Sequence, residues 1–189
     1  MDNRIASLIQ ESQELHDRLE QLVPSIAKAA GMMIGCIRHG GKVMFAGNGG
    51  SAADAQHMAA ELVNRFRKER PPMAGLALTT DTSVITSIGN DYSFDEIFEK
   101  QVMALGRRGD ILVGISTSGS SPNIVRAIKA AGQMGISTIC LTGEGGTIRD
   151  LVDCAICVPS GSTPRIQEAH ILIEHILCEL VEDSSSCSI

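Results

Sequence analysis

Residues 42–51 read KVMFAGNGGS, so a short apolar run leads directly into a glycine-rich loop. A second stretch of the same kind, ILVGISTSGSS, covers residues 111–121. A buried strand that ends in Gly and Ser and then enters a helix offers backbone N–H groups and hydroxyls to an anion. Two such strand–loop–helix units in one chain favour an α/β protein that binds a phosphorylated small molecule.

The rest of the chain repeats the alternation of strand and helix. Apolar runs predict further strands at about 75–79, 136–142 and 154–158, beside those at about 42–46 and 110–115. Helical spacing predicts helices at about 3–22, 24–40, 51–67, 83–88, 93–105, from Ser121 onward, and 163–182. This pattern implies an α/β fold with a doubly wound, five-stranded parallel sheet flanked by helices. Ligands of such sheets bind at the carboxyl ends of the strands.

The length bounds the organisation of the chain. A chain of 189 residues fits one domain, so we expect a single domain over residues 1–189. The two N-terminal helices, within residues 1–40, are expected to form a helical hairpin that packs outside the sheet or against another subunit. The Ser-rich residues 183–189 are expected to be a disordered tail.

Composition excludes several classes of partner. The net charge of −6 argues against nucleic acid, because phosphate backbones select basic surfaces. No apolar stretch approaches the ~20 residues that a bilayer span needs, and residues 1–4 lack a signal-peptide pattern, so we expect a cytoplasmic protein with no membrane partner. Most of the six cysteines, including the Cys154–Cys157 pair, lie in apolar runs and are expected to be buried thiols.

The first loop allows a second interpretation. Residues 47–52 match the relaxed GxGxxA fingerprint of dinucleotide-binding loops. That fingerprint expects an acidic residue at the end of the second strand, but Glu69 lies before this strand and Asp81 lies too far along. A tight turn alone would explain the glycines. Asn48 beside them, and Ser51 as the expected helix N-cap, favour contact with a ligand.

The second loop is rich in hydroxyls. Five of the six residues in 116–121 are Ser or Thr, and the sixth is Gly119. An ordinary capped helix start explains only Ser121, which precedes Pro122. A phosphate accepts several hydrogen bonds, and hydroxyls at a helix N-terminus supply them without a buried cation. The second loop is therefore predicted to bind phosphate.

Two helices carry candidates for acid–base chemistry. His57 and Glu61 are four residues apart, so they share one face of their helix. Such a pair can bind a divalent metal, or the glutamate can act as a base; an ordinary surface pair is the alternative. The last helix carries Gln167 and His175. His175 lies between apolar residues, so a core histidine is the alternative there.

Taken together, these motifs resemble the sugar isomerase (SIS) fold, and within it the phosphoheptose isomerase family. The likeness runs over nearly the whole chain. The stretches that carry it are GNGGSAADAQH at 47–57, GND at 89–91, GISTSG at 114–119 and RIQE at 165–168.

The resemblance implies a role for each matching residue. Glu61 and His175 match the catalytic pair. His57, Glu61, Gln167 and His175 match the ligands of one zinc ion per subunit. The positions that match substrate-binding residues are Asn48, Gly49, Gly50, Ser51, Glu61, Asn90, Asp91, Ser116, Thr117, Ser118, Ser121 and Gln167.

The implied reaction converts sedoheptulose 7-phosphate to D-glycero-D-manno-heptose 7-phosphate through an enediol, for bacterial lipopolysaccharide. The implied assembly is a homotetramer. Gln167 and His175 are eight residues apart, a rise of roughly 12 Å on a helix. Joint binding of one ion from one chain is therefore awkward. We expect these two residues to serve different copies of the site, or to come from neighbouring chains at a subunit interface.

A related SIS family provides a rival interpretation. Its members bind the bacterial replication initiator and are not isomerases, and the sequences NRF at 64–66 and ERP at 69–71 look more like that binder. The binder lacks the glutamate at position 61 and the histidine at position 175, which this chain has, so the isomerase is favoured. An isomerase or deaminating enzyme acting on another phosphosugar is a third possibility.

Overall fold

Five parallel strands form the central layer in the order β2-β1-β3-β4-β5, in a computed structural model that describes residues 1–185. Their bounds are β1 Val43–Gly47, β2 Gly75–Ala77, β3 Ile111–Ser116, β4 Ser137–Thr142 and β5 Cys154–Cys157. From β1 the chain first crosses to β2 on one side and then returns to β3 on the other. The order reverses between β1 and β3, and a doubly wound sheet places its ligand at this point.

The strands are apolar on both sides because both faces of the sheet are covered. Val43 and Phe45 pack into one hydrophobic cluster, while Met44 and Ala46 pack into the other. All four side chains are fully buried. A strand of this kind reads as a continuous apolar run, which is the pattern seen at residues 43–46.

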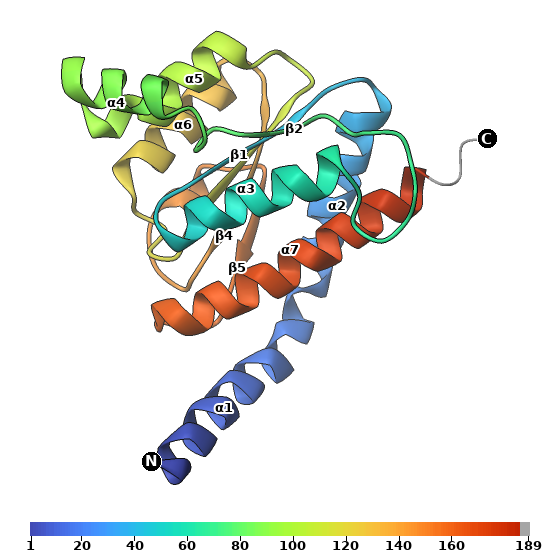
Figure 1. Ribbon diagram of the computed structural model, residues 1–189, viewed down its shortest axis with the longest axis vertical. Coiled ribbons are helices and arrows are strands. Elements are labelled where there is room, and N and C mark those ends of the chain that lie inside the picture. Colours follow the sequence, from blue (N-terminus) through green and yellow to red (C-terminus); the bar gives the residue numbers. More distant parts are fainter. Residues whose placement is uncertain (186–189) are drawn as a thin grey trace.

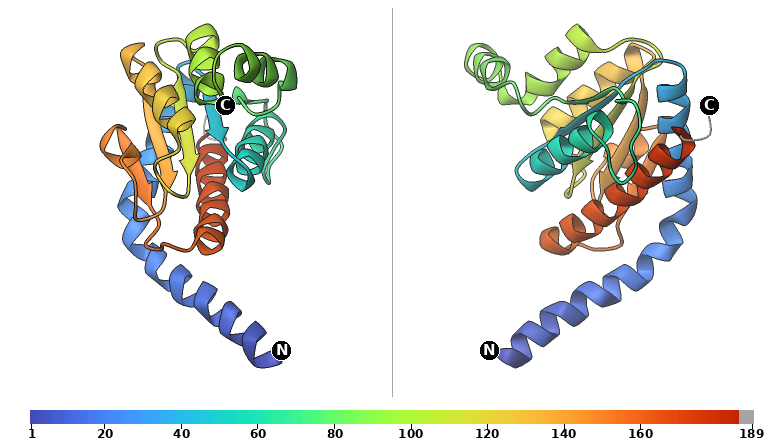
Figure 2. Two further views of the ribbon diagram at one scale, coloured as in Figure 1. Left: turned by 90° about the vertical axis from the view of Figure 1, so that its left-hand side faces the viewer. Right: turned by 45° about the vertical axis from the view of Figure 1, so that its right-hand side comes forward.

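Helices flank the sheet on both faces, as Figures 1 and 2 show. One face carries α2 (Val23–Arg38), α3 (Gly50–Val63) and α7 (Thr163–Ser185). The other face carries α5 (Ile97–Leu105) and α6 (Pro122–Gln133), with α4 (Thr82–Asp91) beside them. Short 3-10 turns η2 (Phe94–Glu96) and η3 (Ile148–Asp150) complete this part of the fold. The expected α/β fold with a five-stranded parallel sheet is confirmed.

The two N-terminal helices follow one another end to end. α1 (Asp2–Asp17) leads through the turn η1 (Arg18–Leu22) into α2, which has a proline in its first turn. α1 projects away from the sheet and touches the body mainly at α7 (Figure 1). Ile5 and Ile9 on α1 are 51% and 55% exposed. This helix therefore presents apolar side chains to solvent.

Several helix boundaries differ from expectation, and those of α3 and α7 bear on the site. The N-cap of α3 is Gly49, with a φ of 56° that favours glycine, so Ser51 lies inside the helix rather than capping it. α3 ends at Val63 and not at about 67. α7 continues to Ser185, so residues 183–185 are helical and only 186–189 of the expected tail lie outside the described residues. The start of α6 is as predicted, with Ser121 at the N-cap and Pro122 next.

The described cysteines are free thiols. Cys36, Cys140, Cys154 and Cys178 are buried, Cys157 is half-buried, and Cys187 lies outside the described residues. Burial raises the pKa of Cys140 to about 12, which makes its thiol a poor nucleophile. Within residues 1–185, no helix is long and apolar enough to cross a membrane.

Candidate active site

A cavity of about 290 Å³ opens where β1 and β3 end. The loop after β1 and the first turn of α3 line one side of it, and the end of β3 with the start of α6 lines another. α7 closes it with Thr163 and Gln167. Three long helices, α3, α6 and α7, begin at this cavity, so the positive ends of their helix dipoles lie near it. None of the described lining residues is a Lys or Arg.

The hydroxyl loop after β3 is folded around Ser116. The Ser116 Oγ lies 2.9 Å from the Ser121 Oγ and 3.4 Å from the Ser118 Oγ. A turn at Gly119, where φ is 63°, bends the chain so that these hydroxyls meet. Ser116, Thr117 and Ser121 line the cavity, and Ser118 lies outside this lining and contacts Ser116. Several hydroxyls and a helix N-terminus together make an anion site without a cation.

An amide pair fixes the loop after β1. Asn48 and Asn123 exchange two hydrogen bonds, each 2.9 Å long, between their side-chain amides. Asn123 is buried at the start of α6, so the pair ties the first loop to the second. The sequence did not single out Asn123, because an Asn in the first turn of a helix is common.

The backbone at Gly50 lies directly against Gln167. A Cβ added at Gly50 would collide with the side-chain amide of Gln167. Because that amide is the far end of a flexible side chain, we expect Gly50→Ala to fold normally and to push Gln167 out of the cavity. The KM for the substrate should rise about tenfold, the cost of roughly one hydrogen bond. Steady-state kinetics measures this effect.

Gly31→Ala is the matched control for this substitution. Gly31 lies in α2, and a Cβ there meets nothing within 4 Å. Both variants gain the helix propensity of alanine, but only Gly50→Ala disturbs Gln167. An unchanged KM in Gly50→Ala would show that Gln167 does not contact the substrate.

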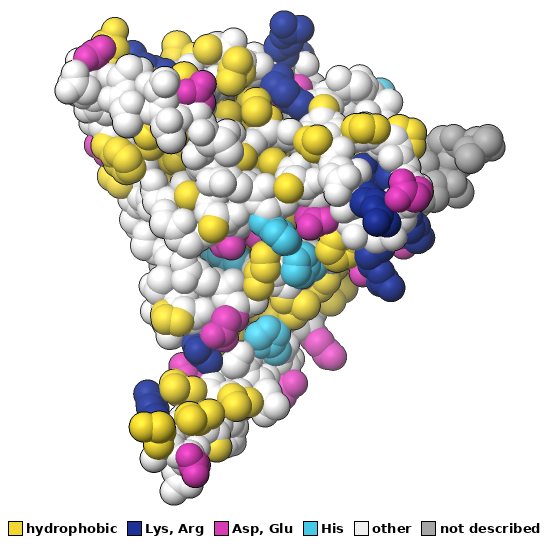
Figure 3. Space-filling model, viewed as in Figure 1, with side chains coloured by type: hydrophobic (Ala, Val, Ile, Leu, Met, Phe, Trp, Pro, Cys, Tyr) yellow, Lys and Arg dark blue, Asp and Glu magenta, His cyan; other side chains and the backbone are white. Residues whose placement is uncertain are grey.

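The acid–base candidates meet between α3 and α7. The Nε2 atoms of His57 and His175 lie 3.0 Å apart, and the His57 Nε2 lies 3.6 Å from a Glu61 oxygen. His175 is half-buried and therefore not a core histidine, whereas His170 on the same helix is fully buried. On the face shown in Figure 3, histidine side chains gather near the middle, over α3 and α7 and beside acidic groups.

α3 and α7 run side by side from the cavity to this cluster. Gly50 on α3 and Gln167 on α7 are in contact at the cavity. His57 and His175 lie seven and eight residues further along and are again in contact. The imidazole pair is therefore about 10 Å from the cavity, the rise of two helical turns.

Two expected substrate residues lie elsewhere in the chain. Asn90 and Asp91 end α4, and the Asn90 amide donates a 2.8 Å hydrogen bond to the Asp91 carboxylate. Both are exposed, and neither lines the cavity between β1 and β3. A single chain thus gathers the two loops, Gln167, His57, Glu61 and His175, but not this pair.

Known proteins resemble this chain over most of its length. The SIS domain family model matches residues 8–143. A phosphoheptose isomerase of Rhodospirillum rubrum is 54% identical over 97% of this chain and 98% of its own length. The chain belongs to the phosphoheptose isomerase family.

Solved structures of this family share the whole fold. The phosphoheptose isomerase of Neisseria gonorrhoeae is 46% identical and superposes with a TM-score of 0.91, covering 96% of this chain and 98% of that one. The enzyme from Francisella tularensis is 42% identical, with a TM-score of 0.92 and coverage of 96% and 97%.

Three of the four expected zinc ligands, His57, Glu61 and His175, lie together and are of types that bind zinc. Two imidazoles and a carboxylate are common zinc donors, and tetrahedral bonds of ~2.0–2.1 Å separate neighbouring donors by about 3.3 Å. The separations of 3.0 and 3.6 Å lie on either side of that value. Within residues 1–185, no three His, Cys, Asp or Glu side chains are already arranged around a metal position. Small side-chain rotations would therefore accompany binding.

A buried polar group beside the site was missed by the sequence analysis. Glu174 is 1% exposed, and neither of its carboxylate oxygens has a hydrogen-bond partner within residues 1–185. Burial, and then the nearby Asp54 carboxylate, raise the pKa of Glu174 to about 9. Burial also lowers the pKa of His170 to about 4. No local pattern marks these two residues as buried, because Glu174 and His170 look like ordinary polar positions of an amphipathic helix.

Proposed function

We propose that the protein is an aldose–ketose isomerase that converts sedoheptulose 7-phosphate to D-glycero-D-manno-heptose 7-phosphate. The observation that carries the proposal is the spacing between the phosphate-type cavity and the Glu61–His57–His175 cluster. An extended seven-carbon sugar bound by its phosphate in the cavity would place its carbonyl end near this cluster. The names of the relatives and their identity over the full chain support the same reaction.

The chemistry follows from the groups at the cluster. Glu61 would take the proton from C1 of the ketose and return it to C2 through an enediol, so the carboxylate ends as it began. His175 would move the proton between the two oxygens, since an imidazole can donate at one position and accept at another. His57 contacts both residues and would orient them. No external oxidant or reductant is needed.

The two loops would bind the phosphate end of the sugar. Ser116, Thr117, Ser118 and Ser121 would donate hydroxyl hydrogen bonds, and the N-termini of α3 and α6 would favour the negative charge. Asn48, Gly49, Gly50 and Ser51 would contact the substrate from the other side of the cavity. Gln167 would reach it from α7.

We further propose that His57, Glu61 and His175 hold one zinc ion. Bound zinc would polarise the substrate carbonyl as a Lewis acid. Zinc binds the lone pair of an unprotonated ring nitrogen, so the hydrogen bond between the two Nε2 atoms would be lost on binding. A Glu61 that binds zinc is less available as a base. Gln167 lies two turns from His175, so its part in the zinc site is a separate proposal, with the neighbouring chain as the source.

Zinc titration of the apo-protein tests the ligand set. We expect about one zinc per chain in the wild type, and binding weaker by at least about 100-fold in His57→Ala, since losing a ligand costs more than losing an outer-shell partner. His39→Ala, which alters an exposed histidine on the end of α2, should bind as the wild type does. Equal affinity in His57→Ala and the wild type would remove this zinc site.

A homotetramer with sites at subunit interfaces remains part of the proposal. A hollow of about 510 Å³ lies along α1 and α7 and is lined by Ile5, Leu8 and Ile9 among others. A second copy of the chain could cover these apolar side chains and supply Asn90 and Asp91, which a single chain leaves outside the cavity. Light scattering on the purified protein tests this, and a fully active monomer would contradict it.

The decisive experiment mixes the purified protein with sedoheptulose 7-phosphate and follows heptose 7-phosphate. Turnover with zinc supplied supports the isomerase. No turnover would favour the rival, the SIS protein that binds the replication initiator without isomerase activity. A cytoplasmic location and a role in lipopolysaccharide synthesis are parts of the proposal that depend on this result.

A further inference from the structure

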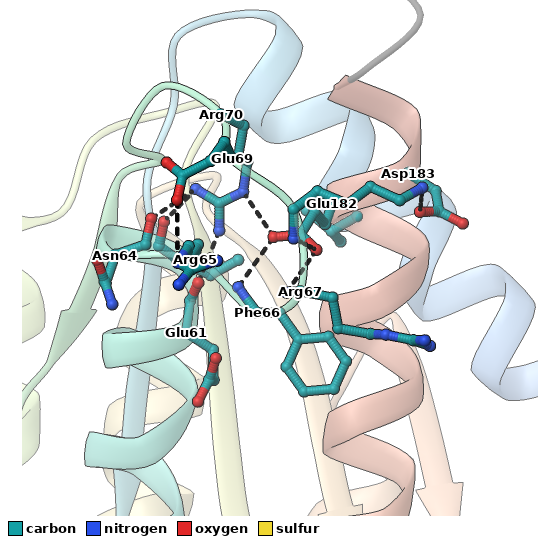
Figure 4. Close-up of polar contacts among 12 residues, drawn as sticks. Glu61, Asn64, Arg65, Phe66, Arg67, Glu69, Arg70, Glu182 and Asp183 are labelled. Carbon is teal, nitrogen blue, oxygen red and sulfur yellow. Dashed lines mark hydrogen bonds and ion pairs between the residues drawn. The ribbon is translucent and has the colours of Figure 1, made fainter.

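Residues 64–71, which we call the clamp loop, connect α3 to the strand β2 and are held by one buried carboxylate. Glu182 of α7 accepts hydrogen bonds of 2.8–2.9 Å from the three consecutive N–H groups of residues 66–68. The Arg70 guanidinium lies 3.2 Å from the same carboxylate, and the two side chains are only 3% and 2% exposed (Figure 4). These contacts fix the clamp loop to α7.

Arg70 links Glu182 to the C-terminal end of α3. Its guanidinium donates hydrogen bonds to the carbonyl oxygens of Glu61, at 2.6 Å, and Leu62, at 2.9 Å. Both carbonyls belong to the last turn of α3, where no intrahelical partner is available. The backbone of Glu61 is therefore tied to Glu182 through a single buried side chain.

The clamp loop also places an aromatic ring against His175. The centroids of the Phe66 and His175 rings are 5.4 Å apart, with 33° between the ring planes. The N–H of Phe66 is one of the three that Glu182 accepts. His175 and Glu182 are seven residues apart on α7, so they lie on the same side of that helix.

The charge of Glu182 persists at neutral pH. Burial acts to raise the pKa of this carboxyl group, but the three backbone N–H donors and Arg70 outweigh burial and keep the pKa below its usual value. The ion pair is therefore present under working conditions.

We propose that Glu182 is a positioning residue, which sets the placement of Glu61 relative to His175 through the clamp loop and Arg70. It touches no reacting atom in this scheme. The kinetic test of this inference rests on the proposed isomerase activity. The spectroscopic test depends only on the contact between the Phe66 and His175 rings.

The kinetic test uses Glu182→Gln, which keeps the size of the side chain but removes its charge. We expect kcat to fall about 10- to 100-fold and KM to stay within about threefold, because misplacement of catalytic groups affects mainly the chemical step. Circular dichroism at the assay temperature establishes that the variant is folded. A purely structural role would lower the melting temperature and leave kcat of the folded enzyme unchanged.

Lys68→Gln is the matched control in the clamp loop. It removes the exposed ion pair of 2.6 Å with Asp183 but keeps the backbone N–H that Glu182 accepts. We expect kcat within about twofold of wild type, since exposed pairs contribute little. If Lys68→Gln loses as much kcat as Glu182→Gln, the effect comes from the change of charge in the clamp loop, and the proposal is overturned.

The spectroscopic test follows the ring resonances of His175 by NMR. Phe66→Ala defines the shifts of His175 without the neighbouring ring. We expect Glu182→Gln to move the His175 resonances toward those values, although residue 182 is about 10 Å away along the helix. In the double variant Glu182→Gln/Phe66→Ala, kcat should be no lower than in the worse single variant, because the Phe66–His175 contact is among those that Glu182 positions.

Each result decides one question. A wild-type protein without turnover contradicts the proposed function, while the His175 resonances still test the positioning role. Wild-type resonances and kcat in folded Glu182→Gln overturn the positioning role and leave the isomerase intact. If Glu182→Gln does not fold, Glu182→Asp replaces it under the same criteria, since it keeps the charge and shortens the reach.

Discussion

Glu61→Gln is expected to lower kcat for sedoheptulose 7-phosphate by about 1,000-fold or more, within or above the range for removal of a general base. The amide cannot take a proton from carbon. Stability should change by less than about 1 kcal/mol, because glutamine keeps the size of the side chain and the ion-pair contact that it loses is the long one of 3.6 Å with His57. Product formation and thermal unfolding measure the two effects.

Glu99→Gln provides the matched control for this prediction. Glu99 lies on α5, on the other face of the sheet, is 23% exposed and pairs with Arg126 at 2.7 Å. The Glu99→Gln variant therefore loses a carboxylate of similar exposure at a site remote from the cluster. Its kcat should stay at the wild-type value. Wild-type turnover in Glu61→Gln would remove this carboxylate from the mechanism.

Glu174→Gln is expected to stabilise the protein, and more so as the pH rises. The folded state keeps Glu174 protonated because its pKa is about 9, whereas an unfolded chain has its ordinary value of 4.5. Below pH 4.5 both states hold the proton, so ionisation of Glu174 contributes nothing to the free energy of unfolding. Between pH 4.5 and 9 the unfolded state gains stability by ionising, a cost to folding on the order of 3 kcal/mol at pH 7 that glutamine avoids.

Urea unfolding of the wild type and the variant at several pH values measures this difference. The groups that face Glu174 are Asp54 from α3 and, on α7, His170 and Cys178, none of which is changed by the substitution. Glu179→Gln, on the same helix but in an exposed pair with Arg67, should show no gain that grows with pH. An advantage for Glu174→Gln that is the same at pH 5 and pH 8 would contradict the ionisation argument.

Local sequence signals located the strands and the two loops. Ser121 followed by Pro122 predicted the start of α6 correctly because both residues act through the backbone of that one turn. The apolar runs predicted the strands because a sheet covered on both faces needs no alternation. The N-cap of α3 was not predicted correctly. Gly49 adopts a positive φ and occupies the N-cap position, so Ser51 lies inside the helix.

The end of α3 could not be predicted from its own sequence. Residues 64–67 continue a helical pattern, but Glu182, more than 110 positions further on, accepts the N–H groups of residues 66–68 and draws the chain out of the helix. The roles of the two histidines on α7 were equally hidden. Which of His170 and His175 faces the core depends on where α3 packs, and a single helix does not encode that.

The parallel run of α3 and α7 also has a consequence for selectivity. With the phosphate held at one end and the proton-transfer groups two helical turns away, the substrate must have enough carbons to reach between them. A hexose phosphate in the same position falls one carbon short, and a pentose phosphate falls two short. On this geometry the enzyme would discriminate by carbon count before it discriminates by the configuration of any hydroxyl.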